Sequence, residues 1–253
     1  MITIKTDAQL EIMRKAGKIA AETLTMLEEK VKPGITTAEI DRVAEEYILS
    51  RQAKPGFKGY RGFPASTCIS IDEEVVHGIP GSRMLKEGQI VSIDLGTIVD
   101  GYYGDSAATF PVGEISEEKR KLLDVTKRSL EIGIEQARAG NKLGKVSAAI
   151  QKYVEAAGFS VVRDMVGHGI GKKLHEDPQV PHFGPEDAGP VLAKGMVIAI
   201  EPMVNVGDYG VNQKADGWTI VTADGSASAH FEHTVAITDN DPEILTLREG
   251  VHA

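Results

Sequence analysis

The feature that most constrains the fold of this chain is an internal repeat with an offset of about 106 residues. Gly34 and Gly140 lie 106 positions apart, each just before a segment of helical periodicity. The apolar run that ends at Asp94 matches the run that ends at Glu201, with an offset of 107 positions. In each half helices come first and strands follow, so the repeat predicts an α+β protein with two pseudo-symmetric halves.

The organisation of the chain predicts a single domain over residues 1–253, with halves at approximately 1–113 and 114–253. No low-complexity tract or Pro/Ser-rich linker divides the sequence. A chain of this length buries roughly 70–75% of its extended surface, which is enough for a substantial hydrophobic core.

Hydrophobic periodicity predicts the secondary structure of most of the chain. Thr6 with Gln9, and Thr36 with Glu39, are predicted to form capping boxes at the starts of the first two helices. The predicted helices span about residues 7–30, 37–50, 116–138 and 145–157. The predicted strands span residues 67–71, 90–99 and 107–112, and strands dominate after residue 157.

The composition excludes several classes of protein. The net charge is −9 and the pI about 5.3, whereas proteins that bind nucleic acids need basic surfaces, so we expect no nucleic-acid partner. The single cysteine, Cys68, excludes an intrachain disulfide. No apolar stretch approaches the roughly 20 residues that span a bilayer, and the first residues lack the apolar core of a secretory signal. We therefore expect a cytoplasmic protein without a membrane segment.

Four carboxylates adjoin predicted strands, two in each half. Asp94 and Glu201 end apolar runs. Asp105 precedes Ser-Ala-Ala-Thr-Phe, and Glu232 precedes His-Thr-Val-Ala-Ile. Any one of them alone is compatible with a strand end that faces solvent, but four in matching positions predict convergence on one site. Because converging carboxylates need a cation to offset their mutual repulsion, this pattern predicts bound metal.

Glycines surround one of the histidines. His168 lies between Gly167 and Gly169, and His175 follows seven positions later. The glycines disfavour a helix and indicate backbone folded tightly around the imidazole. A structural histidine in a turn would give the same pattern, and this ambiguity also holds for His77. The remaining histidines give weaker signals: His182, His230, His233 and His252. His233 is interpreted as structural.

One imidazole with four carboxylates is an oxygen-rich ligand set that suits Mn²⁺, Fe²⁺, Co²⁺ or Zn²⁺ without choosing among them. It does not match a closed structural zinc site, which prefers four Cys or His ligands. The sequence has no His-Glu-x-x-His motif, no Gly-x-Ser-x-Gly elbow and no phosphate-binding loop. Hydrolysis by a pair of divalent ions, about 3.5–4 Å apart, is the chemistry that remains.

Eight short segments between Thr6 and Leu247 form a joint pattern. They are Cys68-Ile-Ser-Ile, Val76-His77-Gly-Ile-Pro, Ile93-Asp94, Gly104-Asp105, Gly167-His168-Gly-Ile-Gly, Leu174-His175-Glu, Ile200-Glu201-Pro-Met and Glu232-His-Thr. The pattern resembles type I methionine aminopeptidases of metallopeptidase family M24. The resemblance implies the pita-bread fold, with two pseudo-symmetric halves around a central antiparallel sheet. It also implies two divalent metal ions, with five side chains as ligands: Asp94, Asp105, His168, Glu201 and Glu232.

The resemblance further implies hydrolytic removal of N-terminal methionine from peptides and nascent proteins, with a small second residue preferred. The metals would hold a bridging water, and Glu201 would take and relay its proton. His175 would stabilise the oxyanion and His77 would contact the scissile amide. The implied substrate pocket comprises Tyr60, Phe63, Cys68, His77, Leu174, His175 and Trp218. We expect a monomer whose substrates are polypeptides with an N-terminal methionine, met as nascent chains near the ribosome.

Three positions depart from the family pattern. Arg61 stands where histidine is frequent, and Leu174 where some members carry an aromatic residue. Asp72 stands where asparagine is usual, beside a monovalent-cation site, which leaves that cation open. Without a cysteine-rich N-terminal extension, the chain resembles the short bacterial or organellar form.

Other functions are compatible with parts of the pattern. Prolidases and aminopeptidase P enzymes share the fold and ligands but usually carry an additional N-terminal domain, and Asp94 comes too early here for one. Noncatalytic binding proteins of the same fold typically lose some ligands, whereas all five are present here. An unrelated binding domain with coincidental carboxylates would show no metal dependence.

Overall fold

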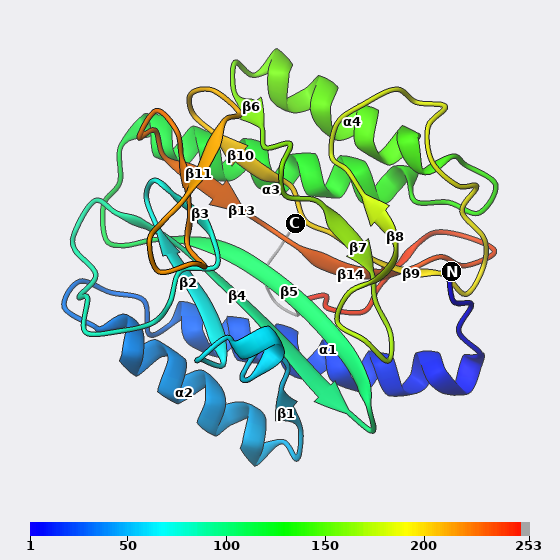
Figure 1. The fold of residues 1–253 in the computed structure, drawn as a ribbon, viewed down its shortest axis with the longest axis horizontal. Helices are drawn as coiled ribbons and strands as arrows, with labels where there is room; N and C mark the ends of the chain where they lie inside the picture. The colour runs from blue at the N-terminus through cyan, green and yellow to red at the C-terminus, as the bar shows by residue number, and fades with distance from the viewer. Residues whose placement is uncertain (249–253) are drawn as a thin grey trace.

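The first two helices begin where the capping boxes predict. In this computed structural model, which describes residues 1–248, Thr6 caps α1 (Asp7–Glu28) and Thr36 caps α2 (Thr37–Ser50), each with a reciprocal bond from the third residue of the helix. Helices α3 (Glu117–Gln136) and α4 (Leu143–Ala156) lie on the other side of the strands, as Figure 1 shows. No helix within the described range is long and apolar enough to cross a membrane.

Fifteen strands form four sheets in the described part of the chain, and every pairing is antiparallel. The strands of the first half are β1 (Lys54–Pro55), β2 (Thr67–Ile71), β3 (Glu74–Val76), β4 (Ile90–Val99) and β5 (Tyr102–Pro111). Those of the second half are β6 (Ser160–Val161), β7 (Gly167–Gly169), β8 (Glu176–Val180), β9 (Val197–Ile200), β10 (Met203–Asn205), β11 (Val211–Gln213), β12 (Ile220–Thr222), β13 (Ser228–His230), β14 (His233–Ala236) and β15 (Glu243–Ile244).

The two larger sheets carry one half each. In the first half β4 pairs with β1, β2 and β5, and apolar residues of this sheet pack against α1 and α2. In the second half the order is β15-β14-β9-β7-β8, and its apolar residues pack with those of α3 and α4. Two three-stranded sheets, β13-β10-β6 and β11-β12-β3, complete the fold. The α+β architecture predicted from the repeat is therefore confirmed.

The repeat has a direct counterpart in backbone geometry. Gly34 N–H donates to the carbonyl of Leu85 over 2.8 Å, and Gly140 N–H donates to the carbonyl of Leu192 over 2.9 Å. Both glycines adopt positive φ, 92° and 89°, a conformation that L side chains rarely adopt. An equivalent pair of isolated β-bridges follows: Thr36 with Met84, and Lys142 with Val191. The same turn thus leads into the second helix of each half.

The two larger sheets meet where β5 lies against β14 and the residue just before it. The backbone N–H of Asp105 donates to Thr234 Oγ1 over 3.0 Å, and that hydroxyl donates to the Asp105 carbonyl over 2.7 Å. Two residues away, Glu232 N–H donates to the Ala107 carbonyl over 2.9 Å. These bonds bring one acidic residue of each half to the seam between the sheets.

The sequence prediction placed the start of β5 too late. The strand begins at Tyr102 rather than at residue 107, so Asp105 lies inside the strand instead of preceding it. Glycine and aspartate are depleted in strands, which concealed its first half. Gly104 is needed there because α1 passes close by: a Cβ on Gly104 would lie 2.5 Å from the backbone nitrogen of Gly17. The predicted bounds of α2 and the start of α1 match the observed ones, and the other helix ends differ by one to two residues.

Glu74 of β3 is a buried carboxylate outside the predicted ligand cluster, and it provides a test of buried electrostatics. Its side chain is 4% exposed and accepts hydrogen bonds from Arg83, from Lys214 Nζ over 2.6 Å and from Ile71 N–H over 2.9 Å. Burial alone raises the pKa of the Glu74 carboxyl, but the bonds from Arg83, Lys214 and Ile71 outweigh it and lower this pKa below its usual value.

We therefore expect Glu74→Gln to lower the free energy of unfolding at pH 7 by about 2 kcal/mol. Because the pKa is lower in the folded state, the contribution of Glu74 is present above the unfolded pKa and is lost as pH falls through the folded one. Urea unfolding should thus separate wild type and variant at pH 7, and the difference should shrink as the pH falls below the unfolded pKa. The exposed Glu46→Gln, whose partner is Arg42, serves as the control. Equal losses from both variants at pH 7 would contradict this account.

Candidate functional site

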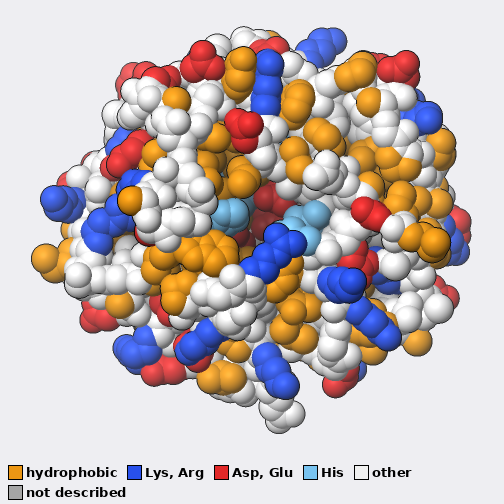
Figure 2. Space-filling model, viewed as in Figure 1, with side chains coloured by type: hydrophobic (Ala, Val, Ile, Leu, Met, Phe, Trp, Pro, Cys, Tyr) orange, Lys and Arg blue, Asp and Glu red, His pale blue; other side chains and the backbone are white. Residues whose placement is uncertain are grey.

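The predicted metal ligands come together from five different segments. Asp94 lies on β4, Asp105 on β5 and His168 on β7, while Glu201 follows β9 and Glu232 precedes β14. All five line one cavity of about 380 Å³. Figure 2 shows acidic and histidine side chains at the bottom of a hollow near the centre of one face of the molecule.

The distances within this cluster are those of side chains that can share a cation. One ligand atom each from Asp105, His168 and Glu232 lies within 4.8 Å of the others. His168 Nε2 is 3.9 Å from Asp105 Oδ2 and 3.5 Å from Glu201 Oε1. Asp94 lies opposite Ala107 in the β4–β5 register, two residues along the strand from Asp105. The four carboxylates and the imidazole therefore face one small volume.

Three carboxylates of this cluster each have a buried oxygen that no hydrogen bond from the described residues satisfies. Within residues 1–248, no hydrogen-bond partner reaches the buried oxygens Asp94 Oδ1, Asp105 Oδ1 and Glu232 Oε1. Burial raises the pKa of Asp105 to about 7, and burial with the charges of Asp105 and Glu201 raises that of Glu232 well above its usual range. Buried, unpaired, mutually repelling carboxylates are the environment that divalent cations stabilise. The residues present therefore fit a metal centre.

His168 is arranged as a neutral ligand. Burial lowers the pKa of its imidazole to about 4, so the ring is uncharged near neutral pH. Its Nδ1 lies 3.0 Å from the carbonyl oxygen of Gly169, which can only accept a hydrogen bond. The proton is therefore assigned to Nδ1, and the lone pair of Nε2 points toward the carboxylates. Such a backbone bond to the second ring nitrogen is typical of metal-bound histidine.

His175 stands at the mouth of the cavity beside His168. The two ring centroids are 4.3 Å apart, and the ring of Tyr60 stacks on His175 at 5.3 Å. The Tyr60 hydroxyl lies 2.8 Å from His175 Nδ1. Partial burial, together with His168 and Arg61, lowers the pKa of His175 to about 3, so this ring is also neutral. It can therefore act as a neutral hydrogen-bond donor within the cavity.

Apolar and sulfur-containing surfaces form the rest of the wall. The rings of Phe63 and Trp218 meet edge to face with centroids 5.1 Å apart, and Leu174 and Cys68 are buried beside them. Burial and nearby carboxylates raise the pKa of the Cys68 thiol well above its usual value, so it stays protonated. All twelve residues that the sequence singled out line this cavity: Tyr60, Phe63, Cys68, His77, Asp94, Asp105, His168, Leu174, His175, Glu201, Trp218 and Glu232.

Sequence reasoning missed two histidines behind Glu201. The backbone N–H of Glu201 donates to His182 Nε2 over 3.0 Å, and His230 Nε2 lies 3.7 Å from Glu201 Oε2. His230 is two positions before Glu232, so strand alternation could have placed both on one face. His182 carries no comparable signal. His233 bonds Thr246 Oγ1 over 2.9 Å, away from the cluster, as predicted, and His252 lies outside the described residues.

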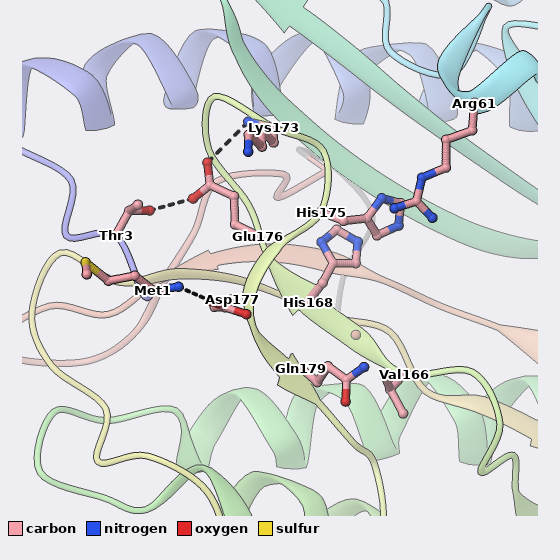
Figure 3. A pocket seen from close by; sticks show the side chains of 11 residues that line it. Met1, Thr3, Arg61, Val166, His168, Lys173, His175, Glu176, Asp177 and Gln179 are labelled. Carbon is pink, nitrogen blue, oxygen red and sulfur yellow. Dashed lines mark hydrogen bonds and ion pairs between the residues drawn. The ribbon is translucent and has the colours of Figure 1, made fainter.

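A second cavity of about 540 Å³ adjoins the first. Both are lined by Arg61, His168 and His175, so the outer cavity continues from the carboxylate cluster toward solvent (Figure 3). Arg61 is exposed and lines both cavities, and its guanidinium carbon lies 5.4 Å from the centroid of the Tyr60 ring. The sequence left open whether a monovalent cation binds beside Asp72. In the structure Asp72 Oδ1 pairs with Lys119 Nζ at 2.5 Å.

Comparison with known proteins gives a consistent result. The model of metallopeptidase family M24 matches residues 11–239. The methionine aminopeptidase of Clostridium acetobutylicum is 59% identical over 98% of this chain and 100% of its own length. The crystal structure of methionine aminopeptidase from Thermotoga maritima superposes with a TM-score of 0.96 at 50% identity, covering 97% of this chain and 99% of that one. Prolidase from Pyrococcus furiosus gives a TM-score of 0.79 at 25% identity, covering 97% of this chain but 66% of that one.

Proposed function

The chain belongs to metallopeptidase family M24, and from this premise we propose that it is a metal-dependent aminopeptidase that removes N-terminal methionine from polypeptides. The predicted resemblance and the pita-bread fold are confirmed. The observation that carries the function is the buried carboxylate cluster, with three unsatisfied oxygens among the described residues, at the wall of an apolar, sulfur-lined pocket. A prolidase-like activity is not favoured, because the chain matches prolidase at only 25% identity.

We propose that five residues hold two divalent ions: Asp94, Asp105, His168, Glu201 and Glu232. Oxygen donors with one imidazole suit Co²⁺, Mn²⁺, Fe²⁺ or Zn²⁺. Ions bound there would supply Lewis-acid polarisation of the scissile carbonyl and lower the pKa of a water molecule to near neutrality. Glu201 is the proposed proton acceptor, because its carboxylate stands within the cluster with 14% of the side chain exposed.

The histidines would act on the peptide itself. His77 and His175 line the same cavity as the metal cluster, and His77 is held at φ of 60°, a conformation uncommon for a residue with a side chain. We assign a hydrogen bond from the Tyr60 hydroxyl to His175 Nδ1, which leaves the ring proton on Nε2. A neutral imidazole in this tautomer can donate to the oxygen on which negative charge develops.

We expect Tyr60→Phe to lower kcat about 10-fold while KM changes less than about threefold. The variant keeps the stacked ring but loses the hydroxyl that fixes the His175 tautomer. Steady-state methionine release from Met-Ala-Ser measures both constants. Tyr153→Phe, which removes a hydroxyl from α4 far from the cavity, is the matched control. A kcat equal to that of the control would refute the tautomer assignment.

The pocket supports specificity for methionine. An unbranched thioether suits a cavity that mixes aromatic and sulfur surfaces, here Phe63, Trp218 and Cys68. We propose a small second residue as well, and nascent chains near the ribosome as substrates, because newly made chains begin with methionine. We further propose that the protein acts in the cytoplasm as a monomer, with residues 1–253 forming one domain. The hydrogen bonds between β5 and the β14 region support the single domain.

A peptide panel tests this function. Initial rates of first-residue release are compared for Met-Ala-Ser, Leu-Ala-Ser and Met-Leu-Ser at equal metal loading. We expect Met-Ala-Ser to be cleaved about 10- to 100-fold faster than either of the others, since each misfit costs roughly 1–3 kcal/mol in a shaped pocket. Similar rates for Met-Ala-Ser and Met-Leu-Ser would remove the second-residue preference. Similar rates for Met-Ala-Ser and Leu-Ala-Ser would contradict the methionine pocket.

A further inference from the structure

A buried ion pair lies behind the loop that carries His175. Lys5, in the segment before α1, is 7% exposed, and its backbone N–H donates to the carbonyl of Gly195 over 2.7 Å. Its ammonium group donates to Glu176 Oε2 over 2.9 Å and to Thr3 Oγ1 over 2.6 Å. The side chains of Lys5 and Glu176 are only 4% and 9% exposed. A buried charge is retained only with such partners.

Glu176, the first residue of β8, directly follows His175. Its carboxylate bonds both the N-terminal segment and the loop before β8. Besides Lys5, it accepts hydrogen bonds from the Thr3 hydroxyl and from Lys173 N–H, the latter over 3.2 Å. Figure 3 shows Thr3 and Lys173 reaching Glu176 from opposite sides, with His175 projecting from the same loop toward His168. The N-terminal segment is thereby joined to the loop that enters the candidate active site.

The backbone around the pair is shaped to admit it. A Cβ on Gly171 would lie 2.7 Å from both Glu176 Oε1 and Lys5 Cε, so a side chain at this position would displace the pair. Gly171 also accepts a hydrogen bond from Tyr103 N–H over 2.9 Å, which anchors the loop to β5. The ion pair is thus enclosed between the N-terminal segment, the loop and β5.

We propose that the Lys5–Glu176 pair, with Thr3, positions His175 for the reaction. This inference rests on the proposed function, in which His175 donates to the developing oxyanion. Such a donor must be held to within about 0.5 Å of its productive place. Tyr60 fixes the ring from the solvent side, and the ion pair fixes the backbone one residue away. Lys5 lines neither cavity, and Thr3 and Glu176 line only the outer one, so the buried pair acts on the reaction through His175.

The test removes the charge of Lys5 and keeps its aliphatic stem. We expect Lys5→Met to lower kcat for Met-Ala-Ser 10- to 100-fold, because a displacement of about 1 Å in a catalytic group can reduce the rate about 100-fold. KM should stay within about twofold and the metal content should not change, since neither the pocket nor the ligands are altered. Arg14→Met, which breaks the half-exposed Arg14–Glu243 pair between α1 and β15, is the control and should leave kcat unchanged.

A double variant separates positioning from general stability. In Lys5→Met with Glu176→Gln no unpaired carboxylate remains, so we expect the melting temperature to recover while kcat stays low. Recovery of kcat together with the melting temperature would overturn the proposal, as would an unchanged kcat in Lys5→Met. The ¹⁵N signals of the His175 ring provide a readout that does not depend on turnover, and they should shift in Lys5→Met but not in Arg14→Met. If wild type releases no methionine, the proposed function fails, and unshifted His175 signals would then reject the positioning role separately.

Discussion

Glu201→Gln should lower the rate of methionine release at saturating metal by about 10³-fold or more. The variant keeps the size of the side chain but removes both a proposed ligand charge and the proposed proton acceptor. Its backbone N–H still donates to His182, so the local fold should be preserved. Single-turnover release from Met-Ala-Ser, with the metal content measured in parallel, gives the size of the loss.

The same substitution should have the opposite effect on the stability of metal-stripped protein. Burial and the charge of Asp105 raise the pKa of Glu201 well above its usual value, which means that the folded state disfavours the ionised carboxyl. We expect the free energy of unfolding at pH 8 to rise by about 0.5–2 kcal/mol, as is common where a functional site is strained. Glu46→Gln, on the exposed face of α2, should change neither activity nor stability. A metal-stripped Glu201→Gln protein that is less stable than wild type would contradict this electrostatic account.

His175→Ala should lower kcat about 10²- to 10³-fold, the usual loss when one oxyanion donor is removed. The proposed ligands do not include His175, so the variant should bind metal as wild type does. Metal analysis after gel filtration and kinetic measurement on the same sample test both statements. Because His175 makes a stacking contact with Tyr60, His175→Gln is the companion variant that retains more of the side-chain bulk.

The two outcomes for His175 have different meanings. Loss of turnover with full metal content supports a donor that acts on the peptide. Loss of metal together with turnover would make His175 a ligand and would require a different assignment for the cluster. Unchanged turnover would remove His175 from the mechanism and would also leave no role for the tautomer that Tyr60 fixes.

Much of the fold was accessible from local sequence signals. Thr6 and Thr36 lie three residues before Gln9 and Glu39, and both capping boxes form as predicted. The strands at 67–71 and 90–99 were predicted with their observed bounds, because continuous β-branched and apolar residues mark them. The offset between the halves predicted that Asp94 and Glu201 occupy equivalent places, and both line the same cavity.

What the sequence could not provide depends on contacts between distant segments. The start of β5 was not predicted, because glycine at position 104 is unfavourable in a strand. Gly104 is needed there because the α1 backbone passes too close for a side chain. His182 approaches Glu201 from another part of the chain, and no local spacing reveals that contact. The Lys5–Glu176 pair joins residues 171 positions apart, so a charged side chain near the start of the chain gave no hint of burial. Such pairings are set by tertiary packing and not by local periodicity.

The most direct test of the central claim is release of free methionine from Met-Ala-Ser by metal-stripped protein and by the same protein given Mn²⁺ or Co²⁺, with Ala-Pro as a control peptide. We expect negligible release without metal, restored release with either ion, and no cleavage of Ala-Pro. Restored cleavage of Ala-Pro alone would move the protein to the prolidase branch of the fold. No metal-restored turnover of either peptide would contradict the account and favour a noncatalytic binding protein.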